Sequence, residues 1–151
     1  MAKTKSKPKP KPKPVSMLII DDNENFLKTI SKYLEEHHAR VIHVLSTARS
    51  GKEGINLAQQ LHPQVVLLDL KMPNMHGFDV IPMLRQALPE VKIITTTLLS
   101  PEIFEQSGEM YQQANVSAGA DAFIPKHNLT TDLIPTILEL MESTAGRLSH
   151  E

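Results

Sequence analysis

The chain has 151 residues, of which 40% are hydrophobic and 22% are charged, and its formal charge is −1. This length and apolar content suit one domain with a buried core, whereas the absence of cysteine excludes a disulfide framework and a zinc–thiolate site. No apolar run approaches the ~20 residues that a membrane-spanning helix needs, so we expect no membrane span and a cytoplasmic location.

The charge is distributed unevenly. Residues 1–14, MAKTKSKPKPKPKP, hold six lysines and no acid, and the rest of the chain holds 10 basic and 17 acidic residues, a net charge of −7. Alternating lysine and proline predicts an extended, disordered tail over residues 1–15. A solubilising leader is the favoured role, and a tether to an anionic lipid surface, an acidic protein or nucleic acid is the alternative. Because the remainder is acidic, we expect no specific nucleic acid as a partner.

Short apolar runs alternate with segments of helical periodicity from residue 17 onward. The predicted strands cover residues 17–20, 40–45, 65–69, 91–97 and 122–124, and the predicted helices cover residues 24–37, 48–61, 78–84, 101–114 and 133–141. Asn23 is a plausible cap of the first helix, Pro82 is tolerable only in a first helical turn, and Ser107-Gly108 interrupts the fourth helix. Residues 16–145 are predicted to form one domain, and residues 146–151 a frayed C-terminus.

The stretch Val65–Asp69, read as VVLLD, is the predicted centre of the fold. A continuous apolar run that ends at turn residues suits a strand buried on both faces of a parallel sheet. Five strands alternating with five helices indicate an α/β fold, a doubly wound parallel sheet with helices on both faces. Right-handed crossovers favour the flavodoxin-like strand order 2-1-3-4-5, in which the first, third and fourth strands are neighbours.

Polar side chains collect where these strands end. The first strand ends at Asp21 and Asp22, the third at Asp69, the fourth at the threonines 95–97, and the fifth shortly before Lys126. All lie at the carboxyl edge, where α/β sheets bind their ligands. Clustered carboxylates without nearby histidine or cysteine suggest Mg²⁺, with Mn²⁺ as an alternative. A metal, a lysine and a hydroxyl around one carboxylate suit transfer of a phosphoryl group to that carboxylate.

These residues carry a resemblance to a known family. The segments LIIDDNENF, VVLLDLKMPNMHG, VKIITTT and GADAFIPK, in this order, resemble the receiver domain of two-component response regulators, from about Met17 to Met141. The resemblance implies that Asp69 is the phosphoacceptor. It also implies that Asp22, Asp69 and the backbone carbonyl of Lys71 bind Mg²⁺ directly, with Asp21 close by or acting through water.

The resemblance implies further roles around the phosphoryl group. Lys126 pairs with its oxygens, Thr97 donates its hydroxyl with Thr96 as the runner-up, and Phe123 is the switching aromatic. The implied partners are a sensor histidine kinase or histidine phosphotransfer protein and an unknown downstream protein that binds the fourth helix, fifth strand and fifth helix. A homodimer is a further output. Turnover is expected only as self-phosphorylation and self-dephosphorylation at Asp69, so the domain is not predicted to be an enzyme.

Three features depart from the family pattern. His76 replaces the acidic residue that often precedes the glycine at position 77, a change that we expect to be tolerated. Leu98 replaces the small residue that normally follows the threonine, so its bulk is expected to restrict access to Asp69. The segment between Thr97 and Lys126 is longer than usual, which lengthens or breaks the fourth helix. The favoured interpretation is a stand-alone receiver that switches a partner-binding surface; a phosphorylation-independent adaptor is the alternative. A phosphohydrolase of the haloacid dehalogenase type ranks low because Lys71 stands where that family has a second aspartate.

Overall fold

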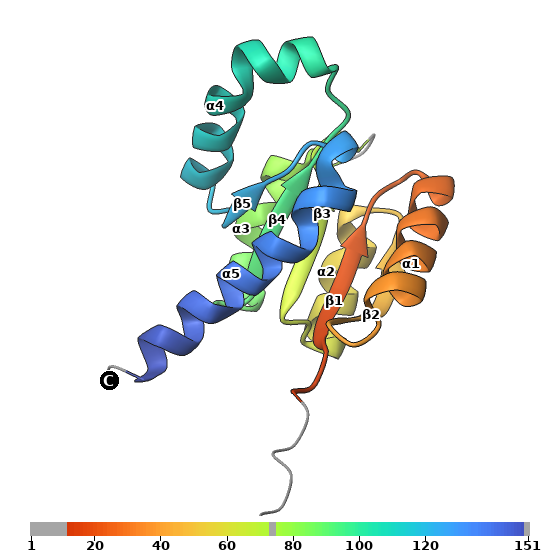
Figure 1. The fold of residues 1–151 in the computed structure, drawn as a ribbon, viewed down its shortest axis with the longest axis vertical. Coiled ribbons are helices and arrows are strands. Elements are labelled where there is room, and N and C mark those ends of the chain that lie inside the picture. The colour runs from red at the N-terminus through yellow and green to blue at the C-terminus, as the bar shows by residue number, and fades with distance from the viewer. Residues whose placement is uncertain (1–11, 73–74, 150–151) are drawn as a thin grey trace, which may run out of the picture.

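The computed structural model describes residues 12–72 and 75–149, with backbone only for residues 144–149. Five parallel strands form one sheet in the order β2-β1-β3-β4-β5, which confirms the predicted doubly wound topology (Figure 1). The strands are β1 (Val15–Ile20), β2 (Ile42–Ala48), β3 (Val65–Asp69), β4 (Lys92–Thr96) and β5 (Ala122–Phe123). The helices are α1 (Glu24–His38), α2 (Gly51–Leu61), α3 (Gly77–Ala87), α4 (Pro101–Ser117), the 3₁₀ turn η1 (Lys126–Asn128) and α5 (Leu129–Ser149).

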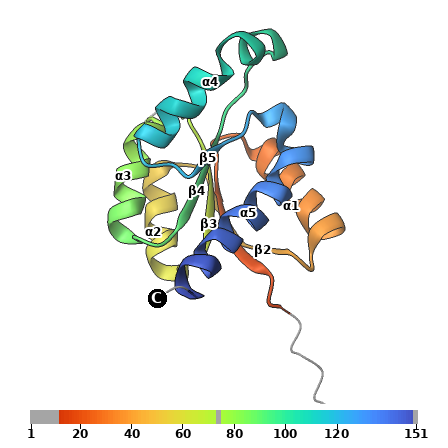
Figure 2. The same ribbon diagram turned by 60° about the vertical axis from the view of Figure 1, so that its left-hand side comes forward.

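The sheet is covered by helices on both faces. Figures 1 and 2 show α1 and α5 on one face and α2 and α3 on the other. Alternate strand residues point to opposite faces, so Ile19 and Leu67 pack with α1 and α5, while Ile20 and Leu68 pack with α2 and α3. All five residues of β3 are buried, as expected for a central strand.

The strand β2 differs from the predicted 40–45, because it begins and ends later in the chain. Residues 39–41 instead form a turn in which Val41 N–H donates to His38 O at 2.9 Å. Pairing with β1 then shifts by one residue, since Met17 aligns with Val44 and Leu18 with Ser46. This irregularity disturbs the apolar alternation, which is why the polar end of the strand was not predicted.

Helices α3 and α4 each continue through a residue that was expected to limit them. Pro82 lies inside α3, not in its first turn; it is exposed, so water can satisfy the carbonyl group that lacks a helical donor. Helix α4 runs unbroken through Ser107-Gly108. A Cβ at Gly108 would lie 3.1 Å from the Phe104 ring, so the glycine gives that ring room to pack on its own helix.

The ends of the domain also differ from the prediction. Strand β1 already includes Val15, which was predicted to belong to the tail, and α5 continues to Ser149, beyond the predicted limit at residue 145. Residues 1–11 of the predicted tail lie outside the described residues. In the described part of the chain, no helix is both long and apolar enough to cross a membrane.

Arg85 ties the amino edge of β4 to its neighbours. Its guanidinium donates to the carbonyl oxygens of Pro89, Val91 and Gly119 and forms a 3.0 Å ion pair with Asp121. The same Asp121 oxygen accepts a hydrogen bond from Ile93 N–H at 2.8 Å. One half-buried side chain thus holds α3 and two loops against the start of β4.

We expect Arg85→Met to lower the free energy of unfolding by about 2 kcal/mol, because it leaves several half-buried carbonyl groups and one carboxylate without their donor. Urea denaturation measures the change. Lys28→Met is the matched control, since the one contact of Lys28 among the described residues is an exposed ion pair with Glu24, and its effect should stay below about 0.5 kcal/mol. Equal effects of the two substitutions would contradict the assigned role of Arg85.

Candidate functional site

The sheet register brings the candidate residues to one edge. Ile20 aligns with Leu68 and Asp69 aligns with Thr96, so the residue after β1, the last residue of β3 and the last residue of β4 lie side by side. Gly77 permits the close turn behind Asp69, because a Cβ there would lie 2.6 Å from Leu70 Cα. The predicted meeting of strand ends is therefore what the fold produces.

Three carboxylates converge at this edge. Asp21 is 1% exposed, Asp69 is 4% exposed and Asp22 is half-buried. One carboxylate oxygen of each lies within 4.8 Å of the other two, a spacing at which a single cation can contact all three. Because hard oxygen donors of this kind suit Mg²⁺, the residues fit the cation that the sequence implied.

Lys126 supplies the positive charge of the site. Its backbone N–H donates to Thr97 O at 3.0 Å, which anchors Lys126 to the residue that follows β4. Its ammonium lies 2.8 Å from Asp21 Oδ2, and its side chain is only 10% exposed. In this structure the lysine pairs with Asp21, and its predicted pairing with a phosphoryl group on Asp69 stays a prediction.

Burial and charge shift the acidity of the Asp69 carboxyl. Burial and, next, the neighbouring Asp21 carboxylate raise the pKa of Asp69 from 3.8 to about 6. The Lys126 ammonium and the Lys71 N–H, which donates to Asp69 Oδ1 at 3.3 Å, act in the opposite direction. The ionised form of Asp69 is therefore disfavoured in free energy, and a bound cation or a covalent modification of the carboxylate would reduce this free-energy cost.

Two threonines lie where β4 ends, Thr96 aligned with Asp69 and Thr97 directly after it. Thr96 and Thr97 are each 1% exposed, and neither Oγ1 has a hydrogen-bond partner within the described part of the chain. A buried hydroxyl without a partner is costly unless a ligand satisfies it. The structure leaves both the predicted Thr97 and its runner-up Thr96 available for that role.

The remaining predicted residues surround this core of the site. Phe123 is 1% exposed, and its ring stacks on Tyr111 of α4 with the centroids 5.6 Å apart. Leu98 is 68% exposed, and its expected effect on access to Asp69 stays a prediction. Lys71 is exposed beside Asp69, and the metal-binding role of its carbonyl stays a prediction.

Sequence reasoning missed the contact that holds α4 to the sheet. Asn115 is fully buried, its Oδ1 accepts from Thr95 Oγ1 at 2.7 Å, and its Nδ2 donates to Tyr111 O at 2.7 Å. Asn115 is the only fully buried residue of this helix. An asparagine in a helix interior is unusual enough to have been a warning, but its partner on β4 was not predictable.

We expect Thr95→Val to lower the free energy of unfolding by about 1–2 kcal/mol, because it keeps the side-chain shape but leaves the buried Asn115 oxygen without a donor. Amide hydrogen exchange of α4 should accelerate more than that of α1. Thr47→Val on β2 is the matched control, as the Thr47 hydroxyl has no hydrogen bond among the described residues. Unchanged exchange in α4 would contradict this account.

The raised pKa of Asp69 predicts how stability depends on pH. The folded protein holds this proton more tightly than the unfolded chain, so stability from this group is greatest below about pH 4 and is lost as the pH rises through about 6. We expect Asp69→Asn, which cannot ionise, to exceed the wild type in stability by about 2 kcal/mol near neutral pH without divalent cations. The difference should vanish near pH 4. Urea denaturation in EDTA across this range tests it, with the exposed Asp79→Asn as the control.

Comparisons with known proteins agree with this fold. A family model described as the response regulator receiver domain matches residues 17–138. Response regulator protein VraR of Staphylococcus aureus (strain Mu3 / ATCC 700698) is 30% identical over 123 residues, which cover 82% of this chain and 54% of VraR. The chain thus spans about half the length of the curated relatives it matches.

Solved structures show the same architecture. The signal receiver domain of a DNA-binding response regulator from Colwellia psychrerythraea 34H has a TM-score of 0.68 at 26% identity, covering 85% of this chain and 98% of that one. The CheX-CheY-BeF3-Mg+2 complex from Borrelia burgdorferi has a TM-score of 0.71 at 19% identity, a likeness of fold, covering 85% and 90%. With a family match that extends from β1 into α5, the chain belongs to the receiver domain family of two-component response regulators.

Proposed function

We propose that this receiver domain is a phosphorylation switch in which Asp69 accepts a phosphoryl group. The observation that carries the proposal is a buried Asp69 carboxyl with a pKa of about 6, surrounded by Asp21, Asp22 and Lys126. Ordinary capping or solvation explains one such aspartate, but not three whose oxygens lie within 4.8 Å of one another.

Asp22, Asp69 and the backbone carbonyl of Lys71 would hold Mg²⁺, with Mn²⁺ as an alternative and Asp21 close by or acting through water. Bound there, the cation supplies positive charge to the oxygens of the transferred phosphoryl group. The carboxylates of Asp21 and Asp22 keep that site negative before transfer. Asp21 also holds the Lys126 ammonium 2.8 Å from its own Oδ2, from which the lysine can move toward Asp69.

The transfer itself takes place between a donor phosphohistidine and Asp69. A lone pair of an Asp69 oxygen forms the new O–P bond as the P–N bond to the donor imidazole breaks. The electron pair of the broken P–N bond stays on the imidazole nitrogen, and the imidazole takes up a proton from solvent. Lys126 and the hydroxyl of Thr97 contact the phosphoryl oxygens. Attack of water on phosphorus then breaks the bond between phosphorus and the Asp69 oxygen, which releases inorganic phosphate and returns the free carboxylate, so turnover is confined to Asp69.

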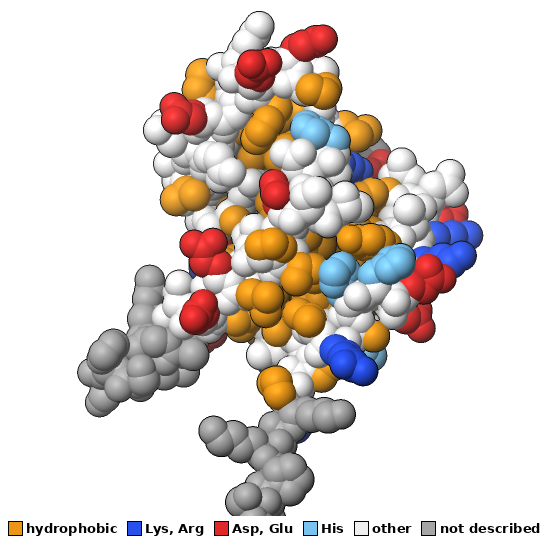
Figure 3. Space-filling model, in the orientation of Figure 1, with side chains coloured by type: hydrophobic (Ala, Val, Ile, Leu, Met, Phe, Trp, Pro, Cys, Tyr) orange, Lys and Arg blue, Asp and Glu red, His pale blue; other side chains and the backbone are white. Residues whose placement is uncertain are grey.

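The donor would be a sensor histidine kinase or a histidine phosphotransfer protein, and the output would pass through α4, β5 and α5. Movement of Thr97 toward the phosphoryl group gives Phe123 a new position, which changes its stacking on Tyr111 of α4. Helix α4 also exposes apolar side chains, among them Ile103 at 48% and Met110 at 71%. Hydrophobic side chains are visible on the surface in the region of this helix (Figure 3). Such side chains suit a downstream protein or a second copy of the domain.

Intact-mass measurement after incubation with acetyl phosphate and Mg²⁺ tests the proposal. We expect one phosphoryl adduct on the wild type, none on Asp69→Asn, and none in EDTA. Lys126→Met should slow uptake by about 10²–10³-fold, because it removes a charge that stabilises the transition state. The exposed Asp79→Asn is the control and should match the wild type.

An adduct that persists in Asp69→Asn would contradict the assigned acceptor. No adduct from acetyl phosphate and none from a phosphorylated histidine phosphotransfer protein would contradict phosphorylation altogether. The domain would then act as a phosphorylation-independent adaptor.

A further inference from the structure

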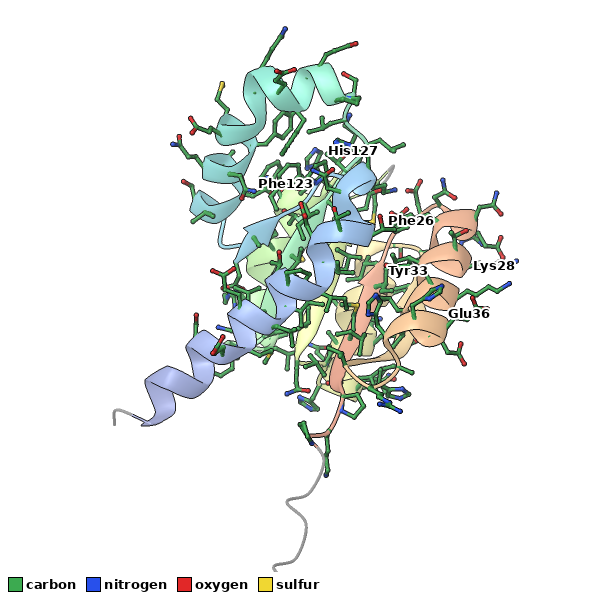
Figure 4. All side chains as sticks on the ribbon, in the orientation of Figure 1. Phe26, Lys28, Tyr33, Glu36, Phe123 and His127 are labelled. Atoms are coloured by element: carbon green, nitrogen blue, oxygen red, sulfur yellow. The ribbon has the colours of Figure 1, made fainter. Side chains whose placement is uncertain are left out.

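Phe26 lies beside the lysine of the site. It is the third residue of α1, and its backbone N–H donates to the side chain of the cap Asn23 at 3.0 Å. The Lys126 ammonium lies 4.2 Å from the centroid of the Phe26 ring. Figure 4 shows the Phe26 side chain between the start of α1 and the segment that begins α5.

Phe26 and Lys126 belong to a closed cycle of contacts that also includes Asp21 and Asn23. Asp21 Oδ1 accepts from Asn23 N–H at 2.8 Å, Asn23 caps the backbone of Phe26, and the Phe26 ring faces the Lys126 ammonium. The 2.8 Å contact between the Lys126 ammonium and Asp21 Oδ2 closes this cycle of contacts. The start of α1 therefore fixes the aromatic ring with respect to the same aspartate that the lysine contacts.

The ammonium is held from two sides. Its side chain is 10% exposed, so little water remains to compete with the carboxylate and the ring. The face of an aromatic ring attracts a cation, and the attraction grows when the pair is removed from water. A leucine at position 26 would keep most of the apolar volume but would lose this attraction.

Phe26 also packs against the apolar core between α1, α5 and the sheet. A purely structural role predicts that any substitution acts through stability alone. A role through the lysine predicts instead that aromatic character matters and that the effect disappears when Lys126 is absent.

We propose that Phe26 is a positioning residue that holds the Lys126 ammonium at the acidic pocket and thereby sets the rate at which Asp69 accepts a phosphoryl group. The inference rests on the proposed function of Asp69. Phe26 itself touches neither the donor nor the acceptor carboxylate; it acts through the lysine.

The first measurement is the initial rate of adduct formation from acetyl phosphate with saturating Mg²⁺. We expect Phe26→Leu to lower this rate about fivefold, the size of a partly desolvated cation–π contact, and Phe26→Tyr to restore most of it. In a Lys126→Met background, Phe26→Leu should have no additional effect. Urea denaturation of each variant confirms that all are folded at the assay temperature.

The second measurement needs no phosphorylation. In protein labelled at the lysine Cε, the Phe26 ring should shift the NMR signal of Lys126, and this shift should be lost in Phe26→Leu and kept in Phe26→Tyr. The Lys126→Met variant identifies the signal.

The outcomes separate the two proposals. If the wild type is phosphorylated on Asp69 but Phe26→Leu reacts at the same rate, or slows equally with and without Lys126, the positioning role is wrong and the switch remains. If the wild type takes up no phosphoryl group from either donor, both proposals fail. If Phe26→Leu lowers the rate by the same factor in the Lys126→Met background, and Phe26→Tyr does not restore the rate, the role of Phe26 is only to pack in the apolar core.

Discussion

The structure is organised around the concentration of negative charge where β1 and β3 end. Asp21 and Asp69 are almost fully buried there, and Asp22 is beside them. Repulsion among carboxylates and loss of water both disfavour this arrangement, and the pKa of Asp69 near 6 records that cost. The apolar sheet supports it because β1 and β3 are buried along most of their length, so their ends cannot move apart without exposing the core.

The Lys126–Asp21 ion pair offsets part of that cost. A buried ion pair is not a strong source of stability by itself, since both charges lose water when they are buried. Its value here is geometric: it places an ammonium beside the carboxylates from the opposite end of the chain. The contact of Lys126 with Phe26 and its backbone bond to Thr97 connect α1, β4 and η1 around this single side chain.

Helix α4 is attached to the sheet differently from the other helices. Where α1, α2 and α3 bury several residues each, α4 buries only Asn115, and it relies on polar contacts and on the stacking of Tyr111 on Phe123. Polar contacts with few alternatives favour discrete positions over gradual sliding. This suits an element that responds to changes at the neighbouring strand ends, and Gln112, which donates to Phe123 O, adds a further link.

Apolar periodicity determined the fold class, the strand order and the meeting of Asp21, Asp69 and the threonines, because parallel strands leave their carboxyl ends at one edge. Only the tertiary structure decided where β2 ends and which contacts form between distant segments. These contacts are the Arg85–Asp121 ion pair, the Thr95–Asn115 hydrogen bond and the position of Lys126 beside Phe26. These depend on the register between segments far apart in the chain and on side-chain packing, whereas a sequence pattern reports only local periodicity. The same reason explains why neither Pro82 nor Gly108 interrupts its helix. Pro82 is exposed to solvent, and Gly108 leaves space for the Phe104 ring.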